Sequence, residues 1–205
     1  MISASRGKRT FESDSSSAFR VSGTVYRDWT DRIYTRSNVA VSSNKPVYAT
    51  REIATDLNFK LLPNAVLTMG GKHARYYDNK DALSWSAGGS LYFGGGFATY
   101  RYSSYDVDNL GKSHGHLATF RLKDGSGAAS TQLWLGSGSS LHEEEMLPSG
   151  RTGTFRSIAL KRVQPVSGPL SLNVSLGRAW YETATTDYQS TKASVGLSFS
   201  RLPKL

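Results

Sequence analysis

Residues 168–202 contain two long segments in which apolar and polar side chains alternate almost without interruption. In the first segment, one set of alternate positions is apolar apart from Arg178, and it consists of Leu170, Leu172, Val174, Leu176 and Trp180. The apolar set of the second segment consists of Ala193, Val195, Leu197 and Phe199. Because successive side chains of a strand point to opposite faces, this pattern predicts a β-hairpin with one apolar face and one polar face.

The polar face of this predicted hairpin carries small residues rather than long charged ones. Its members are Ser171, Asn173, Ser175, Gly177 and Ala179, followed by Lys192, Ser194, Gly196, Ser198 and Ser200. A sheet face that is washed by solvent usually carries long charged side chains, whereas small polar residues suit an enclosed and wet interior. The hairpin is therefore predicted to close a transmembrane β-barrel.

The rest of the chain repeats this pattern of ten or more alternating residues followed by turn residues, and no helical periodicity stands out. Strands of soluble proteins average about 5–6 residues, whereas a strand that spans a membrane needs about 9–11. The pattern predicts an all-β fold, an antiparallel up-and-down transmembrane β-barrel of about 12 strands, or 10 if the first two are not strands. Residues 1–205 are predicted to form a single domain, in which residues 1–16 are either a first strand or an N-terminal extension.

Turns and aromatic residues predict how this barrel is oriented. Short turns near Thr30, Pro63, Gly95, Gly125 and Ser167 alternate with connections near Asp14, Asn44, Asn79, Gly111, Glu144 and Thr185, which include the three longest. Outer-membrane barrels have short periplasmic turns and longer outer loops, so the first set is predicted to be periplasmic. An aromatic girdle at the two membrane interfaces is predicted from Trp29, Phe59, Trp85, Phe93, Trp180 and Phe199.

Composition narrows the class of protein further. The chain of 205 residues has no cysteine, which excludes disulfides and thiolate metal sites. Its net charge of +9 comes from scattered Lys and Arg residues without a basic run, so nucleic acid is not an expected partner. No apolar run approaches ~18 residues, which argues against a membrane helix. The first residues lack an apolar signal peptide, so this is expected to be a mature chain of the Gram-negative outer membrane.

Four short segments carry a family resemblance. They are Tyr26-Arg27-Asp28-Trp29-Thr30-Asp31-Arg32, Lys45-Pro46-Val47-Tyr48, Lys60-Leu61-Leu62-Pro63-Asn64 and Tyr100-Arg101-Tyr102-Ser103. Together they resemble the YaiO-type outer-membrane β-barrel family, over roughly residues 26–202. The resemblance implies an outer-membrane barrel that is often attached to, or neighbours, polysaccharide machinery. One departure is that barrels of this class usually end on an aromatic residue, whereas this chain continues past Phe199 to Arg201-Leu202-Pro203-Lys204-Leu205.

The charged residues on the polar faces are the best functional candidates in the sequence. The residues predicted to line a lumen are Arg20, Arg32, Arg36, Glu52, Asp56, Lys60, Arg101, Arg121, Lys123 and Lys192. A basic lumen favours anionic solutes such as acidic saccharides or an anionic polysaccharide. The alternative is that ion pairs and tyrosines simply fill the interior of a narrow barrel, and the sequence leaves both readings open.

The predicted function is a narrow channel or a membrane anchor associated with the export or passage of saccharides and anionic solutes. Its expected partners are outer-membrane lipids and lipopolysaccharide, a polysaccharide or anionic saccharide, and periplasmic export components. No catalytic residue, cofactor or metal site is expected. Two alternatives remain open, a membrane-embedded lipid or acyl hydrolase that uses His73 or His116, and a soluble β-barrel binding protein.

Overall fold

The computed structural model describes residues 1–11, 14–43, 47–76, 79–108, 111–125, 128–139, 153–183 and 187–199. These residues form a sheet of twelve β-strands, each 10 to 15 residues long. The strands are β1 (Ile2–Phe11), β2 (Asp14–Asp28), β3 (Ile33–Ser42), β4 (Arg51–Leu62), β5 (Ala65–Arg75), β6 (Asp81–Phe93), β7 (Gly96–Val107), β8 (Gly111–Lys123), β9 (Ser130–Ser139), β10 (Gly153–Ser167), β11 (Leu170–Thr183) and β12 (Asp187–Phe199). None of the described residues forms a helix that is long and apolar enough to cross a membrane.

Strand order follows chain order from β1 to β12, so the sheet is up-and-down and contains no crossover. This result confirms the prediction of an all-β antiparallel fold, and it favours twelve strands over ten because the first two predicted strands are both present. β1 and β12 are the two ends of this order, and within the described residues no pairing between them closes the sheet.

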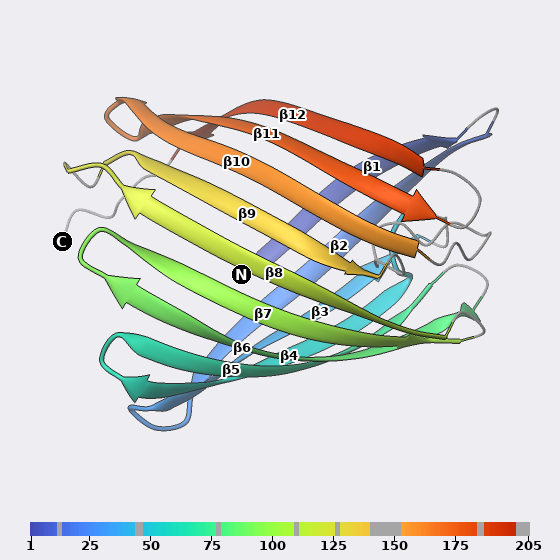
Figure 1. Cartoon of the computed structure of the whole chain (residues 1–205), viewed down its shortest axis with the longest axis horizontal. Helices are drawn as coiled ribbons and strands as arrows, with labels where there is room; N and C mark the ends of the chain where they lie inside the picture. Colours follow the sequence, from blue (N-terminus) through green and yellow to red (C-terminus); the bar gives the residue numbers. More distant parts are fainter. Residues whose placement is uncertain are drawn as a thin grey trace. The chain divides into compact units, whose positions relative to one another are not determined.

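Among the described residues, the first of two compact units comprises Met1–Gly89 and Tyr102–His114. It contains β1 to β5, in which each strand lies beside the next (Figure 1). Its register places Glu52 of β4 opposite Ala40 of β3 and opposite Ala74 of β5. This register determines which polar side chains of different strands can meet.

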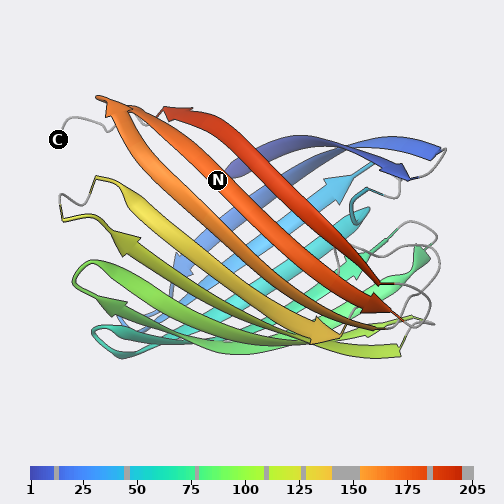
Figure 2. The ribbon, with the colours of Figure 1, turned by 45° about the horizontal axis from the view of Figure 1, so that its top comes forward.

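The second unit comprises Ser90–Arg101, Gly115–Ser140 and Arg151–Leu205. It contains β9 to β12 and most of β8, and β9 to β12 run side by side in both ribbon views (Figures 1 and 2). Lys161 of β10 lies opposite Gln132 of β9 and opposite Ser175 of β11. The expectation that residues 1–205 form a single domain stays a prediction.

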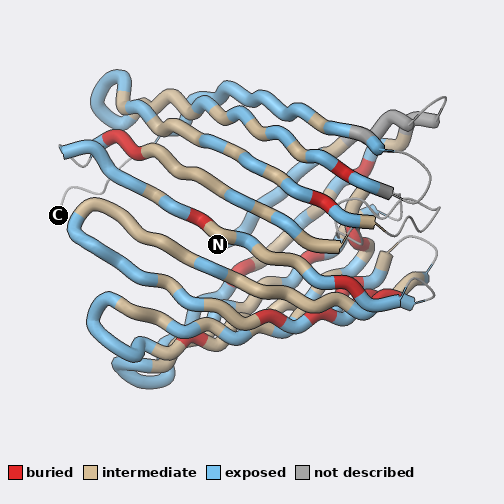
Figure 3. The backbone as a smooth tube through the Cα atoms, in the orientation of Figure 1, coloured by how far each residue is buried: buried red, intermediate tan, exposed pale blue. Residues whose placement is uncertain are grey.

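Burial along the strands is the reverse of the pattern in a water-soluble protein. In β6, Ser84 and Ser86 are buried, whereas Leu83 and Trp85 between them are 62% and 55% exposed. Buried positions are short interruptions along strands that are otherwise half-buried or exposed (Figure 3). A soluble domain hides its large apolar side chains, so an exposed apolar face of this extent indicates that the face contacts an apolar medium.

The tight turns occur where the sequence predicts them. Residues 63–64, 94–95 and 168–169 connect β4 to β5, β6 to β7 and β10 to β11. Gly168 has a φ of 49°, a backbone conformation that glycine adopts without a steric penalty from Cβ. The connection at residues 140–152 and the C-terminal tail from residue 200 lie outside the described residues, and the predicted periplasmic and outer sides stay predictions.

The two faces of β11 provide a test of the membrane-facing assignment. Leu176 is 59% exposed on the apolar face, and its neighbour Ser175 lies on the polar face, where its hydroxyl lies 2.6 Å from that of Ser194. We expect Leu176→Lys to lower the free energy of unfolding by about 2–4 kcal/mol, because a cation near the bilayer centre is poorly solvated. Ser175→Lys should cost only about 0.5–1.5 kcal/mol, the value of one lost hydrogen bond.

The measurement is urea unfolding of both variants after refolding into phospholipid vesicles. An equal loss of stability in the two variants would contradict the assignment of the apolar face to lipid.

Candidate functional site

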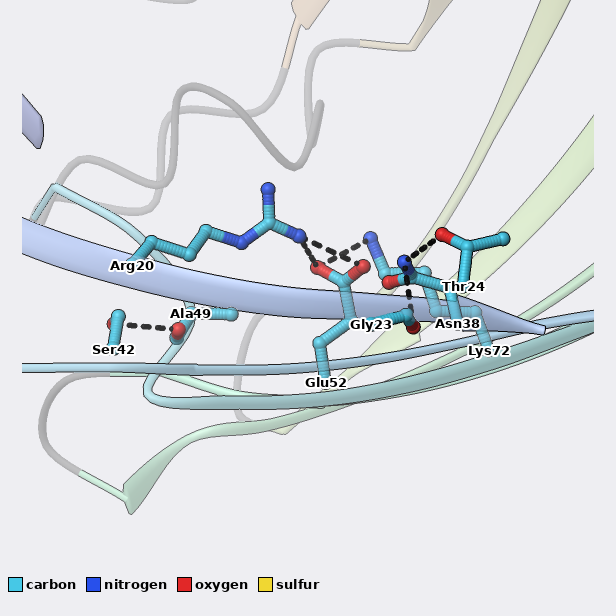
Figure 4. Close-up of polar contacts among 8 residues, drawn as sticks. All are labelled: Arg20, Gly23, Thr24, Asn38, Ser42, Ala49, Glu52 and Lys72. Carbon is cyan, nitrogen blue, oxygen red and sulfur yellow. Dashed lines mark hydrogen bonds and ion pairs between the residues drawn. The ribbon is translucent and has the colours of Figure 1, made fainter. Parts of the chain in front are cut away.

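An ion-pair cluster on the polar face of the first unit joins three strands. Arg20 of β2, Glu52 of β4 and Lys72 of β5 form this cluster, which we call the Glu52 cluster (Figure 4). Arg20 Nη2 donates to both carboxylate oxygens of Glu52 at 3.1 Å, and Lys72 Nζ lies 3.3 Å from Glu52 Oε2. The Glu52 side chain is only 14% exposed, so two cations share one well-covered carboxylate.

Small neighbours make this convergence possible. Ala40 and Ala74 are the cross-strand partners of Glu52, and they are 2% and 0% exposed. Because neither side chain extends beyond Cβ, the long side chains of Arg20 and Lys72 can reach over them to the carboxylate. Tyr48 adds a further contact, with its ring centroid 6.0 Å from Arg20 Cζ.

Polar contacts continue along the same face away from the Glu52 cluster. The Asn38 side-chain amide donates to Thr24 Oγ1 at 2.9 Å and to the carbonyl of Gly23 at 3.3 Å (Figure 4). Further along, Thr68 Oγ1 donates to Asn58 Oδ1 at 2.8 Å. These bonds satisfy polar groups that the sheet partly buries, which favours an ordered polar face.

The charges of Arg36, Asp56 and Lys60 lie on this face as well. Arg36 is the register partner of both Tyr26 and Asp56, and its Cζ lies 5.9 Å from the Tyr26 ring centroid. Lys60 Nζ lies 5.7 Å from the ring centroid of Tyr34. The acidic and basic residues of the first unit therefore alternate over its polar face.

The polar face of the second unit carries basic residues without acidic ones. Register places Arg121, Gln132, Lys161, Ser175 and Ser194 in one row across β8 to β12. Lys192 lies on the same face, opposite Gly177. The described acidic residues of this unit are Asp124, Glu182 and Asp187, and none of them lies on this face. Asp124 lies in the connection between β8 and β9. Glu182 and Asp187 are register partners on the apolar face of β11 and β12.

The structure brings some of the predicted lumen residues together and separates others. Arg20 and Glu52 form an ion pair, and Arg36 lies opposite Asp56. Arg121, Lys123 and Lys192 share the polar face of the second unit. Arg101 belongs to this face too, because Tyr100 beside it contacts His116 on the other side. Arg32 lies in the connection between β2 and β3, where its carbonyl accepts the Lys60 amide.

Sequence reasoning missed Lys72 and Lys161. Lys72 lies in β5, where Gly70 and Gly71 interrupt the alternation of apolar residues. Lys161 is followed by Arg162, and two adjacent cations interrupt the alternation of apolar and polar residues in β10. Counting positions from Leu160 would have assigned Lys161 to the polar face.

The predicted girdle residues are mostly exposed. Exposure ranges from 41% to 69% for Trp29, Trp85, Phe93, Trp180 and Phe199, and Phe59 is half-buried. Arg178 interrupts the apolar face of β11 and hydrogen-bonds to Gln189, and its Cζ lies 5.5 Å from the ring centroid of Trp180. The hydrogen bond and the cation–π contact stabilise the charged guanidinium on an otherwise apolar surface. The girdle function stays a prediction.

The two histidines proposed for a hydrolase contact a carboxylate and a phenol. His73 Nε2 lies 3.5 Å from Asp81 Oδ1, and His116 Nδ1 lies 2.7 Å from the Tyr100 hydroxyl. Among the described residues, no group of three or more potential ligands could hold a metal ion. Neither of these two histidine contacts is with a serine.

An ion pair links β10 to the connection that joins β8 and β9. Arg162 Nη1 donates to Asp124 Oδ1 at 2.9 Å and Nη2 donates to Oδ2 at 2.5 Å. The same guanidinium donates to Thr131 and Gln164. The hydrogen bonds from Arg162 hold the pKa of the Asp124 carboxyl below its usual value, because they stabilise its charged form.

Comparison with known proteins places this fold among outer-membrane barrels. The sequence profile of the YaiO membrane beta barrel domain matches residues 4–145. The structure is similar to an anion-selective porin from Comamonas acidovorans, with a TM-score of 0.55 and 14% identity over 88% of this chain and 58% of the porin. It is also similar to OprD of Pseudomonas aeruginosa, with a TM-score of 0.55 and 14% identity over 96% of this chain and 65% of OprD.

These similarities indicate a porin-like barrel fold and an outer-membrane location. The chain spans less than two thirds of the length of each of these porins. At this level of identity the likeness concerns the fold, and the chemistry of the lumen has to be argued from the residues of this chain.

Loss of the shared carboxylate should destabilise the Glu52 cluster. We expect Glu52→Gln to lower the free energy of unfolding by about 1.5–3 kcal/mol, because charged hydrogen bonds to Arg20 are lost and two cations remain close together. Glu182→Gln is the matched control, since the exposed Glu182 accepts one hydrogen bond from Thr154. Its cost should stay within about 0.5 kcal/mol. Urea unfolding in micelles measures both, and an unaffected Glu52→Gln protein would contradict this role.

The Asp124–Arg162 pair should make stability depend on pH. A carboxyl with a lowered folded-state pKa adds stability above its unfolded-state pKa of about 4, and this stability is lost as the pH falls through the folded-state value. We therefore expect Asp124→Asn to be less stable than the wild type at pH 7, with the difference shrinking below pH 4.

Urea midpoints measured from pH 7 to pH 2.5 test this expectation. Arg162→Gln should remove the pH-dependent difference, and the double variant should lose little more than either single one. Additive losses would show that the two residues do not act as a pair.

Proposed function

Because the chain belongs to the YaiO membrane β-barrel domain family, as its sequence resemblance predicted, we propose that it forms a channel in the outer membrane of Gram-negative bacteria. In this proposal the exposed apolar face contacts lipid and the polar face lines a lumen. Outer-membrane barrels have this arrangement of faces, with alternate residues of each strand pointing to the membrane and to the interior. The solutes are anions, acidic saccharides among them.

The charge balance of the polar face is the observation that carries the proposal. On the first unit, the cations Arg20, Arg36, Lys60 and Lys72 outnumber the anions Asp28, Glu52 and Asp56. On the second unit, Arg121, Lys161 and Lys192 face no acidic residue among the described positions of that face. An excess of fixed cations in a low-dielectric channel concentrates anions and repels cations.

The comparisons support this proposal only at the level of the fold. One similar structure is an anion-selective porin, but an identity of 14% carries no information about individual lumen residues. Anion preference in this chain is argued from its own cations. The alternative, in which the charges merely fill a narrow interior, predicts a barrel that conducts no ions and serves as an anchor or receptor.

A function in saccharide export is the narrower form of the proposal. The family resemblance implies proximity to polysaccharide machinery, so the partners would be periplasmic export components on one side and lipopolysaccharide in the surrounding leaflet. The contacts of His73 with Asp81 and of His116 with Tyr100 do not involve a serine, so they do not favour the hydrolase alternative. The soluble-binder alternative conflicts with the exposed apolar face and with membership of a membrane barrel family.

Planar-bilayer recordings test the channel. We expect the refolded protein to conduct and, in a KCl gradient, to show a reversal potential that reports preference for chloride over potassium. Lys161→Gln combined with Lys192→Gln should reduce this preference severalfold, because both cations lie on the polar face.

Arg156→Gln is the matched control, because it removes a similar charge from the apolar face, where Arg156 lies opposite Trp180. Its selectivity should equal that of the wild type. A barrel that folds but passes no current would refute the channel, and an equal effect of all three substitutions would refute the assignment of faces.

A further inference from the structure

We propose that Trp134, Arg121 and Lys161 form a binding site for an acidic saccharide on the polar face of β8 to β10. The proposal rests on the function above, because the ligand reaches this face only through a lumen. It goes beyond that function by naming the residues that recognise the solute and the chemistry that they recognise.

Trp134 is the tryptophan that differs in position from the other three. Trp85 and Trp180 are exposed on apolar strand faces, and Trp29 is exposed in the connection after β2. Trp134 instead is half-buried and lies on the same polar face as Gln132. Register establishes this face, since Trp134 lies opposite Thr119 and Ala159, while the neighbouring Leu133 lies opposite Phe120 and Leu160. A large aromatic ring therefore stands on a face composed mostly of small and charged residues.

Short residues lie directly opposite Trp134 on both neighbouring strands. Its two cross-strand partners, Thr119 and Ala159, are short, and Gly136 and Gly177 follow nearby on the same face. A Cβ at Gly136 would lie 2.4 Å from Ser157 Oγ, and a Cβ at Gly177 would lie 3.2 Å from Ala159 Cβ. Gly136 and Gly177 are therefore sites of close packing by Ser157 and Ala159, and the Phe155 ring lies 3.6 Å from the same Cβ position at Gly136.

Two cations flank the indole. Gln132 is the register partner of both Arg121 and Lys161, which makes both cations diagonal neighbours of Trp134 at roughly 7–8 Å between backbone positions. Arg121 donates one hydrogen bond, from Nη2 to Ser130 Oγ at 3.2 Å. Within the described residues, Lys161 has no hydrogen bond or ion pair, and the Trp134 indole has none either.

These groups match the chemistry of an acidic sugar. The apolar C–H face of a pyranose ring can pack on an indole, which presents a flat apolar body and one N–H donor. A carboxylate on the same sugar can accept charge-assisted hydrogen bonds from the guanidinium and the ammonium group. A neutral sugar would gain only the stacking contact, so the two cations select for the acidic ligand.

Fluorescence of Trp134 provides a test that is independent of ion current. In a reporter variant, Trp29, Trp85 and Trp180 are replaced by Phe, so that Trp134 is the single remaining tryptophan. We expect a hexamer of galacturonic acid to change its emission in detergent micelles, and high salt to weaken the effect because the attraction is electrostatic. Maltohexaose, a neutral oligomer of the same length, should produce a much smaller change.

Substitutions in the reporter identify the contributing cation. Lys161→Gln should weaken the apparent affinity for the acidic hexamer about tenfold, which corresponds to about 1.4 kcal/mol. Arg156→Gln, on the apolar face, should leave this affinity unchanged. If the reporter fails to fold, calorimetric titration of the wild type against Trp134→Phe replaces it, with binding expected only in the wild type.

The outcomes separate this site from the channel. No response to the acidic hexamer at millimolar concentration, or an equal response to maltohexaose, would overturn the site even if the barrel conducts anions. A selective response in a barrel that conducts no current would support the site and would refute the channel.

Discussion

Backbone hydrogen bonding between neighbouring strands is the constraint that organises this protein. In an apolar medium an unpaired amide or carbonyl costs several kcal/mol, so a chain that crosses a membrane without helices must pair each strand with the next. The observed order from β1 to β12 meets this demand by placing each strand beside the next one along the chain. Once the strands are paired, side chains can only point to one face or the other, and every polar contact of the candidate site follows from that division.

Small residues give the polar face its chemistry. Ala40 and Ala74 allow Arg20 and Lys72 to reach Glu52 from strands on either side. On the second unit, the short residues Thr119 and Ala159 lie opposite Trp134, and no acidic residue lies opposite Lys161. The first arrangement satisfies its charges internally and stabilises the sheet, whereas the second leaves cations available to a solute. In the proposed function, the polar face of the first unit therefore stabilises the sheet, and the polar face of the second unit provides the cations that attract the solute.

Much of the fold could be predicted from the sequence, and less of the site. The clean alternation around Leu172 and Val195 predicted long strands, and the family resemblance predicted a membrane barrel. Arg20 and Glu52 were both predicted to line the lumen, and one of the two alternatives expected ion pairs there, but the sequence did not indicate that these two residues pair with each other. Lys72 was missed because glycines break the alternation of β5, and Trp134 was passed over because aromatic residues were sought at the membrane interfaces.

The sequence by itself determined which residues of each strand share a face, because successive side chains point to opposite sides regardless of what the strand pairs with. The sequence also determined that each strand has one apolar face and one polar face, with Leu176 on the first and Ser175 on the second. Only the tertiary structure decided which residues of different strands meet. Register is the alignment of two paired strands along their length, and it depends on residues that are far apart in the sequence. It determines that Arg20 meets Glu52 and that Lys161 is a diagonal neighbour of Trp134.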